Sequence, residues 1–191
     1  EAIQRRFDDV DYLHDLGEAI WRDDQQASMY RLIVEGAIRV TQSTGGALYL
    51  YDEASQQLVP RHYSDFCAPL ISLPERVRQQ MKENSATLLS TLRMHAETVQ
   101  SGLLGSVFMQ QKTELLPDLG TDTRLGQHLV PSQQHVTAMI GPLSFGVRRL
   151  GVLAVTSPKD GRSYNANDFE VFNSLIEQSA FALANAMSHQ E

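Results

Sequence analysis

The sequence feature that most limits the possible folds is an apolar stretch at residues 135–158, HVTAMIGPLSFGVRRLGVLAVTSP. It holds two runs of small and β-branched residues, 136–145 and 150–156, and a turn at Gly146 separates them. Each run is too short and too β-branched for a helix, and the glycine supplies the backbone freedom that a hairpin turn requires. The stretch therefore predicts the central hairpin of an antiparallel sheet.

The second run also predicts what surrounds this sheet. Residues 151–155 are almost continuously apolar, which is typical of a strand covered on both faces. Helices must then pack on the sheet. Apolar residues recur at three- and four-residue steps in 3–21, 29–41 and 167–188, so we expect three amphipathic helices. Residues 23–28 predict a break between the first two helices.

The remaining segments predict shorter elements. Asn167 is the expected N-cap of the C-terminal helix. Prolines and a helical periodicity occur together in residues 64–101, which indicates an insertion with one long helix or two shorter ones. Four other elements are expected, in chain order. They are a hairpin of strands 47–51 and 57–63, a short helix at 102–109, a short strand at 114–116 and a loop at 117–131.

Composition narrows the range of functions. The chain has 191 residues, which suits one domain, and its net charge of -7 argues against nucleic acid as a partner. Its densest basic groups are only pairs, Arg5 with Arg6 and Arg148 with Arg149. A single cysteine cannot form an internal disulfide, so a reduced, cytoplasmic setting is expected. No apolar run is as long as a membrane span, so direct membrane insertion is not expected.

Three segments carry a characteristic order of elements. The first, TQSTGGALYLYDEASQQLVPRH, has small residues, a strand and an acidic turn after a helix. The second, GLLGSVFMQQKTELLPDLGTDTRL, has a glycine-flanked helix, a short strand and a loop with a DxR element. The third is the central hairpin with the helix NANDFEVFNSLIEQSAFALANA after it. In this order, from about Ser28 to Met187, the chain resembles the GAF domain, a small-molecule-sensing module of phosphodiesterases, histidine kinases, cyclases and transcription activators.

The resemblance implies an α+β GAF (PAS-like) fold, with a central antiparallel sheet, helices on both faces and long N- and C-terminal helices. It divides the chain into a signalling or dimerisation helix at 1–27 and a GAF domain at 28–191, with the insertion at 64–101. The implied function is a non-enzymatic regulatory sensor of a bacterial-type signal transduction protein, which binds a small molecule. Its terminal helices would relay the change to an output domain, expected outside this chain because it begins with Glu1.

A second interpretation stays open, in which the chain is a ligand-free dimerisation and protein-interaction module whose pocket is filled by the insertion. Bulky side chains that point inward from Phe66, Leu70, Leu88 or Leu92 would favour it. Both interpretations predict a homodimer through the N- and C-terminal helices.

The candidate ligand-binding residues combine aromatic rings that stack on a planar ligand with polar groups that hold it. Arg124 lies in the loop that closes over the pocket in similar domains, and its guanidinium suits a bidentate contact with an anion. An equally weighted interpretation has the aspartates of this loop capping backbone amides. The resemblance does not identify a particular small-molecule ligand or cofactor. The full set of candidates is Tyr49, His62, Phe66, Asp118, Asp122, Arg124, His128 and Thr137.

Several other kinds of site are not expected. The spacing of His62, His95, His128 and His135 fits no metal or haem motif. Bilin-binding relatives place a histidine directly after the attachment cysteine, whereas Ala68 follows Cys67, which argues against a bilin. The chain has no nucleophile elbow and no phosphate-binding glycine loop.

Two further expectations concern the final helix. Lys159 and Asp168 are expected to form an ion pair between the loop after the last strand and this helix, in preference to contacting a ligand as in cyclic-nucleotide-binding relatives. Phe172 and Leu183 are expected in the dimer interface, so charged substitutions there should yield monomers.

Overall fold

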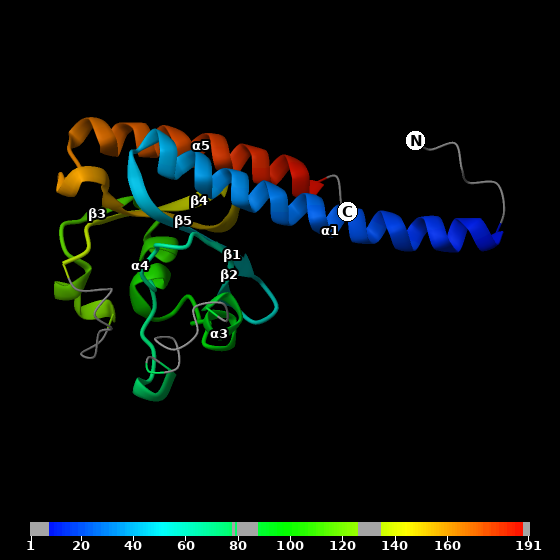
Figure 1. The fold of residues 1–191 in the computed structure, drawn as a ribbon, viewed down its shortest axis with the longest axis horizontal. Helices are drawn as coiled ribbons and strands as arrows, with labels where there is room; N and C mark the ends of the chain where they lie inside the picture. Colours follow the sequence, from blue (N-terminus) through cyan, green and yellow to red (C-terminus); the bar gives the residue numbers. More distant parts are fainter. Residues whose placement is uncertain (1–7, 78, 80–87, 126–134, 189–191) are drawn as a thin grey trace.

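The computed structural model describes residues 8–77, 79, 88–125 and 135–188, which form a five-stranded antiparallel sheet with helices on both faces (Figure 1). The strand order is β2-β1-β5-β4-β3. The strands are β1 Ser43–Asp52, β2 Gln57–Tyr63, β3 Glu114–Leu116, β4 Ala138–Phe145 and β5 Arg148–Pro158. The helices are α1 Asp8–Val40, α3 Leu88–Met94, α4 Gly102–Gln110 and α5 Ala166–Ser188, and short 3₁₀ turns are η3 Leu119–Thr121, η4 Thr123–Leu125 and η6 Lys159–Gly161. The expected fold class is confirmed.

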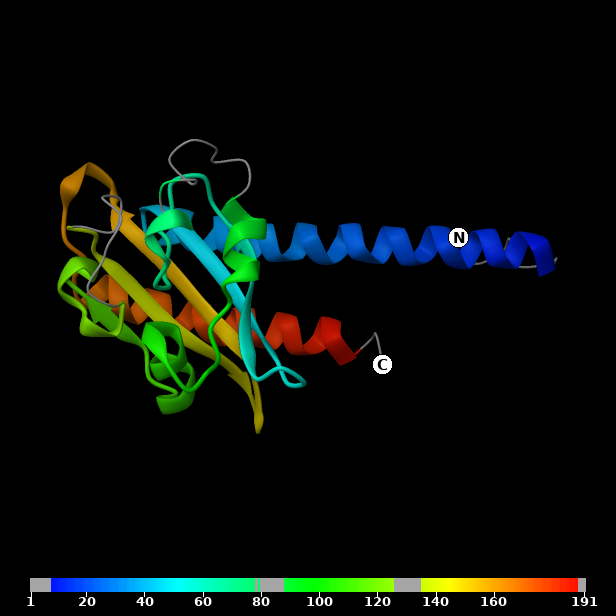
Figure 2. The same cartoon turned by 90° about the horizontal axis from the view of Figure 1, so that it is seen from below.

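The sheet has two faces with separate cores. Helices α1 and α5 cover one face, here called the outer face, and run in opposite directions (Figures 1 and 2). The insertion, with α3, and helix α4 cover the other, inner face. The outer core includes Val34, Leu48, Met139, Leu153, Phe172 and Leu183. The inner core includes Tyr49, Leu70, Leu92, Leu103, Phe108 and Ile140.

Strand β5 is the middle strand, and it is buried on both faces as its apolar run predicts. All residues of 151–156 are buried. Leu153 and Val155 belong to the outer core, whereas Val152 and Ala154 belong to the inner core, because successive side chains of a strand point to opposite faces. The central hairpin β4–β5 is therefore confirmed.

Glycines allow close packing around β1 and β5. Residues 43–46, which lie between the helix and the strand predicted from the sequence, begin β1. A Cβ on Gly45 would lie 2.7 Å from the Cα of Cys67, and one on Gly46 would lie 2.9 Å from Ile38 of α1. At Gly151 the added atom would lie 2.0 Å from the carbonyl oxygen of Tyr49. Neighbouring backbone and helix therefore reach the sheet only because these positions lack a side chain.

Helix α1 is continuous over 33 residues, so the break expected at residues 23–28 is wrong. That segment holds no glycine or proline. Asp24 and Ser28 are exposed, so their side chains meet water and leave the helical backbone bonds intact. The division of the chain at residue 27 stays a prediction.

The other predicted elements are confirmed with small shifts at their ends. They are both hairpins, α4, β3 and α5. The predicted loop after β3 contains the turns η3 and η4 in its described part. The insertion contains α3, and since residues 78 and 80–87 lie outside the described ranges, the choice between one long helix and two stays open.

The close approach at Gly151 predicts a strong effect of a single methyl group. Gly151→Ala should lower the free energy of unfolding by about 2 kcal/mol or more, because the atom that it meets is backbone and cannot rotate away. Gly36→Ala is the matched control, since nothing lies within 4 Å of its added Cβ in α1. It should stabilise by about 0.5–1 kcal/mol through helix propensity. Urea unfolding of both variants measures the difference, and equal effects would contradict the packing argument.

Candidate functional site

The inner face is where the resemblance places a ligand pocket, and in the described residues it is filled by side chains. Tyr49, Leu70 and Leu92 are each 1% exposed or less and belong to one continuous inner core. A hollow beside Glu97 and Leu104 is too narrow to hold a water molecule. The insertion therefore packs directly on the sheet.

The polar groups of this layer are satisfied within the protein. The hydroxyls of Tyr49 and Tyr63 form a hydrogen bond, and the backbone N–H of Leu70 donates to the Tyr63 hydroxyl at 3.2 Å. Burial raises the pKa of both tyrosines, so both phenols are neutral. Burial also raises the pKa of Cys67 to about 12. This thiol is therefore protonated and packs as a small apolar group.

The other candidate residues do not gather around Tyr49. His62 pairs with Leu48 of the outer core, so it faces α1, and burial there lowers its pKa. The ring of Phe66 is 76% exposed. Thr137 donates its hydroxyl hydrogen to the carbonyl oxygen of Pro117 at 2.8 Å. His128 lies outside the described residues, and a binding role for any of these residues stays a prediction.

Arg124 is held by carboxylates of its own chain. Its two Nη atoms donate to Glu114 at 2.9 and 2.8 Å, and Nη2 and Nε also donate to Asp122 at 2.7 and 3.0 Å. The hydrogen bonds from Arg124 lower the pKa of Asp122. Asp118 accepts from the backbone N–H of Gly120 at 2.7 Å, which is the capping role weighed from the sequence. The sequence did not identify Glu114 as a partner of Arg124, although an acidic residue on a strand beside this loop could have indicated it.

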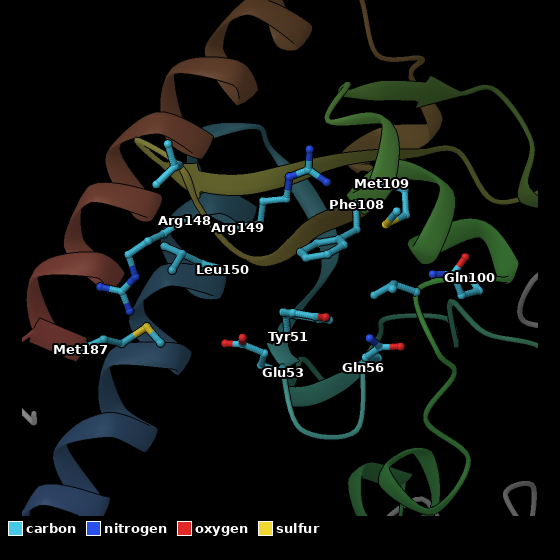
Figure 3. A pocket seen from close by; sticks show the side chains of 12 residues that line it. Tyr51, Glu53, Gln56, Gln100, Phe108, Met109, Arg148, Arg149, Leu150 and Met187 are labelled. Atoms are coloured by element: carbon cyan, nitrogen blue, oxygen red, sulfur yellow. The ribbon is translucent and has the colours of Figure 1, made fainter.

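A groove of about 570 Å³ lies at one end of the sheet (Figure 3). Its lining comes from four parts of the chain: the end of β1 with the β1–β2 turn, the β4–β5 turn with the start of β5, the segment that leads into α4 with α4 itself, and the last turn of α5. The lining includes Tyr51, Glu53, Gln56, Gln100, Phe108, Met109, Val147, Arg148, Arg149 and Met187. None of these residues belongs to the set of ligand-binding candidates predicted from the sequence.

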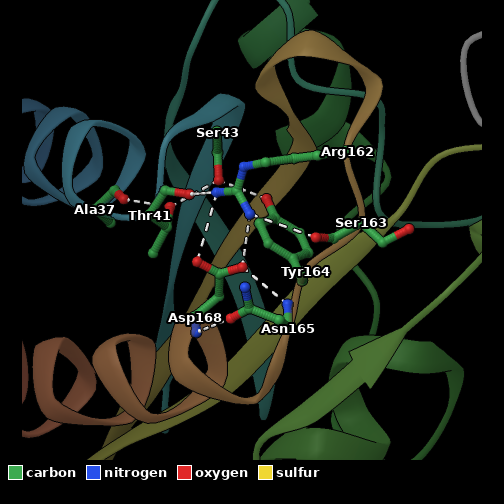
Figure 4. A network of polar contacts seen from close by, with 8 residues as sticks. All are labelled: Ala37, Thr41, Ser43, Arg162, Ser163, Tyr164, Asn165 and Asp168. Carbon is green, nitrogen blue, oxygen red and sulfur yellow. Dashed lines mark hydrogen bonds and ion pairs between the residues drawn. The ribbon is translucent and has the colours of Figure 1, made fainter.

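A polar network lies at the opposite end of β1 and joins α1 to α5 (Figure 4). Thr41 donates its only hydroxyl hydrogen to the carbonyl oxygen of Ala37 at 2.6 Å. Ser43 must therefore donate to Thr41, and Tyr164 must donate to Ser43, because each hydroxyl has one hydrogen to give. The hydroxyl chain is thus fixed in one direction.

Arg162 completes this junction. It donates through Nη2 to the carbonyl oxygen of Thr41 at 2.8 Å and through Nη1 to Asp168 at 2.7 Å. Partial burial acts to raise the pKa of Asp168, but the hydrogen bond and charge of Arg162 outweigh it and the pKa is lowered. The expected ion pair of Lys159 with Asp168 is wrong, because Arg162 occupies the carboxylate and Lys159 is exposed.

The start of α5 is a capping box centred on Asn165. Its side chain accepts from the backbone N–H of Asp168 at 2.8 Å, and Asp168 accepts in return from the backbone N–H of Asn165 at 2.8 Å. The predicted cap at Asn167 is wrong, because that residue lies inside the first turn and is exposed. Two asparagines so close together give the same local signal.

This capping geometry predicts different effects for the two asparagines. Asn165→Ala should lower the free energy of unfolding by about 1 kcal/mol, because the Asp168 N–H loses its acceptor. Asn167→Ala should leave it unchanged or raise it slightly, since alanine favours helix. Thermal unfolding followed by circular dichroism would measure both, and the reverse order would restore Asn167 as the cap.

Glu97 is a half-buried carboxyl that sequence analysis did not select. It accepts from the backbone N–H of Ser72, and its Oε1 lies 2.2 Å from where a Cβ on Gly102 would stand. Its backbone carbonyl accepts from the N–H of Leu58 at 3.1 Å. Burial raises the pKa of Glu97 and outweighs the lowering by Ser72. Glu97 thus contacts β2, the start of α4 and another part of the insertion. Burial disfavours the charged form of its carboxyl group.

The raised pKa of Glu97 predicts a pH-dependent gain from its neutral isostere. The folded state binds this proton more tightly than the unfolded chain, so stability falls as pH rises from the ordinary value of 4.5 through the folded pKa. Glu97→Gln should therefore raise Tm by about 1–3 °C at pH 7 and have little effect below pH 4.5. A loss of stability at pH 7 would show that the carboxylate is favoured where it lies.

The described residues include no group of three or more His, Cys, Asp and Glu side chains that could hold a metal ion. Within the same ranges, none of the helices is long and apolar enough to span a membrane.

Comparisons with known proteins agree with this architecture. A family model described as GAF domain matches residues 25–184. A GAF domain/HD domain protein from Geobacter sulfurreducens has a TM-score of 0.64 at 14% identity, over 84% of this chain and 93% of that one. The second GAF domain of DevS from Mycobacterium smegmatis has a TM-score of 0.58 at 21% identity, over 86% of this chain and 96% of that one. Residues 122 to 287 of a methyl-accepting chemotaxis protein have a TM-score of 0.55 at 17% identity, over 82% of this chain and 87% of that one.

No curated protein matches the sequence significantly. The three solved structures named above are each below 25% identity, so their likeness concerns the fold. The family model, in contrast, covers most of the chain from the second half of α1 to the last turns of α5. Sequence and fold together confirm the resemblance, and the chain belongs to the GAF domain family.

Proposed function

We propose that this chain is a regulatory module of a signal transduction protein, which dimerises through α1 and α5 and relays a conformational change along them to an output domain. Proteins with similar domains include a methyl-accepting chemotaxis protein. The observation that carries the proposal is the arrangement of the two terminal helices. They share the outer face, and the start of α1 and the end of α5 point in the same direction (Figures 1 and 2).

Exposed apolar side chains on α1 support a helical interface. Leu32 is 63% exposed and Val40 is 48% exposed, although both lie on a helix whose other side packs on the sheet. A second copy of the chain would cover these side chains and gain their burial free energy. The N-terminal part of α1 extends past the sheet, so it can contact a partner helix without displacing the domain (Figure 1).

Phe172 and Leu183, which the sequence pattern placed in the interface, are unsuitable as tests of dimerisation. Both are fully buried in the outer core. A charge at either position would unfold the domain, because an unpaired buried charge costs several kcal/mol. A test of the interface therefore needs the exposed side of α1.

The packing of the inner core bears on whether the module binds a ligand beneath the insertion. Leu70 and Leu92 are fully buried there, the feature that favours a module whose pocket is filled by the insertion. Phe66 is exposed instead, and the side chain of Leu88 lies outside the description. We therefore favour regulation through protein contacts over a ligand beneath the insertion. A small-molecule sensor is the second candidate, and the carboxyl of Glu97 within this layer favours it.

The proposal predicts that one charge on α1 separates the dimer. Native mass spectrometry of the wild type should give twice the chain mass of 21.4 kDa, and Leu32→Glu should give the single chain mass. Val147→Glu is the matched control, because it places the same charge on an apolar side chain that is 100% exposed at the β4–β5 turn. It should remain dimeric.

Other results of the same measurement would overturn the proposal. A monomeric wild type, or a Leu32→Glu variant that stays dimeric, would contradict the α1 interface. A reproducible extra mass that disappears on denaturation would favour the small-molecule sensor over the ligand-free module.

A further inference from the structure

The groove in Figure 3 arises because two hairpins diverge at one end of the sheet. β1 and β5 pair as far as Leu50 and Gly151, and beyond this point β1 pairs only with β2. On the other side, Leu143 pairs with Gly151 but Ser144 pairs with Arg149, so Leu150 is the extra residue of a β-bulge. Bulges redirect side chains and are frequent beside binding sites.

Two arginines, Arg148 and Arg149, lie directly before this bulge on β5. Among the described residues, neither Arg148 nor Arg149 makes a side-chain hydrogen bond or ion pair, whereas Arg124 and Arg162 are both paired with carboxylates. Figure 3 shows the guanidinium groups of Arg148 and Arg149 on opposite sides of Leu150. The groove therefore has a cationic group on each side.

The charge of the groove differs in sign from that of the chain. Its lining includes two guanidinium groups and one carboxylate, that of Glu53, in a protein with a net charge of -7. Guanidinium groups bind carboxylate and phosphate oxygens through paired hydrogen bonds. The amides of Gln56 and Gln100 add uncharged hydrogen-bonding groups on the opposite wall.

The rest of the lining is apolar and adaptable. The rings of Tyr51 and Phe108 pack with their centroids 4.8 Å apart and form one wall. Met109 and Met187 line other parts of the groove, and thioether side chains adjust to ligands of different shape. The volume of about 570 Å³ falls within the range of sites for small organic molecules.

We propose that this groove binds a small amphipathic anion, which carries one carboxylate or phosphate group on a flat apolar body. The guanidinium group of either Arg148 or Arg149 holds the anionic group, and the wall formed by Tyr51 and Phe108 contacts the apolar body. The site lies at the diverging ends of two hairpins, away from Leu70 and Leu92 beneath the insertion. Binding there does not require the proposed dimer.

Amide chemical shifts of the ¹⁵N-labelled protein test the site directly, with phenylacetate and phenyl phosphate as probes. Either probe should shift amides around Gln56, Val147 and Met187 in a saturable way, with a Kd of about 1 mM for so small a molecule. The stronger of the two identifies carboxylate or phosphate as the preferred group. Phenylacetamide, which has the same shape as phenylacetate without the charge, should bind at least about fivefold more weakly.

Charge-removing variants provide the second part of the test. Arg148→Gln or Arg149→Gln should weaken binding of the preferred probe by about fivefold, with the rest of the spectrum unchanged. Arg39→Gln removes the same charge from an exposed position at the end of α1, near the opposite end of β1, and should leave the Kd unchanged. The proposal fails if neither probe shifts the groove amides at about 20 mM, if phenylacetamide binds equally, or if both groove variants retain the wild-type Kd.

Discussion

The burial of β5 on both faces is the constraint on which the rest of the structure depends. A strand in this position has side chains that point into two separate cores, so Leu153 needs helices on one side and Ala154 needs a cover on the other. Helices α1 and α5 cover the outer face. The inner face is covered by α4 and by the insertion, whose Leu70 and Leu92 are fully buried. Covering apolar surface is therefore a sufficient physical reason for the insertion to pack where a ligand was expected.

The sequence predicted those parts of the fold that depend on local periodicity. The β-branched run around Val152 identified the central hairpin, and the apolar spacing after Phe169 identified α5. It failed where one local signal has two structural outcomes. Asp24 and Ser28 resemble a helix break, yet polar residues on an exposed helical surface interrupt nothing. The cap of α5 is a second example. Asn165 caps the helix through Asp168, which also binds Arg162, and helix periodicity does not predict these contacts.

The candidate site was harder to predict than the fold, because it depends on register and on contacts between distant segments. Tyr49 and His62 come from paired strands, but a register shift between Leu48 and Tyr49 sets His62 opposite Leu48 of the outer core. Tyr49 belongs to the inner core, so the two side chains lie on different faces. The groove beside Arg148 depends on a bulge and on four separate parts of the chain, and residue spacing alone specifies neither.

The polar junction gives the proposed relay a fixed end. Arg162 joins the carbonyl of Thr41, directly after α1, to Asp168 in the first turn of α5, and the hydroxyls of Ser43 and Tyr164 form a second connection. The opposite ends of the two helices lie beyond this junction, and there α1 extends past the sheet (Figure 1). A small rotation about the junction would therefore displace the far ends most, because displacement grows with distance from the fixed point. In the proposed dimer, those far ends are the parts closest to an output domain.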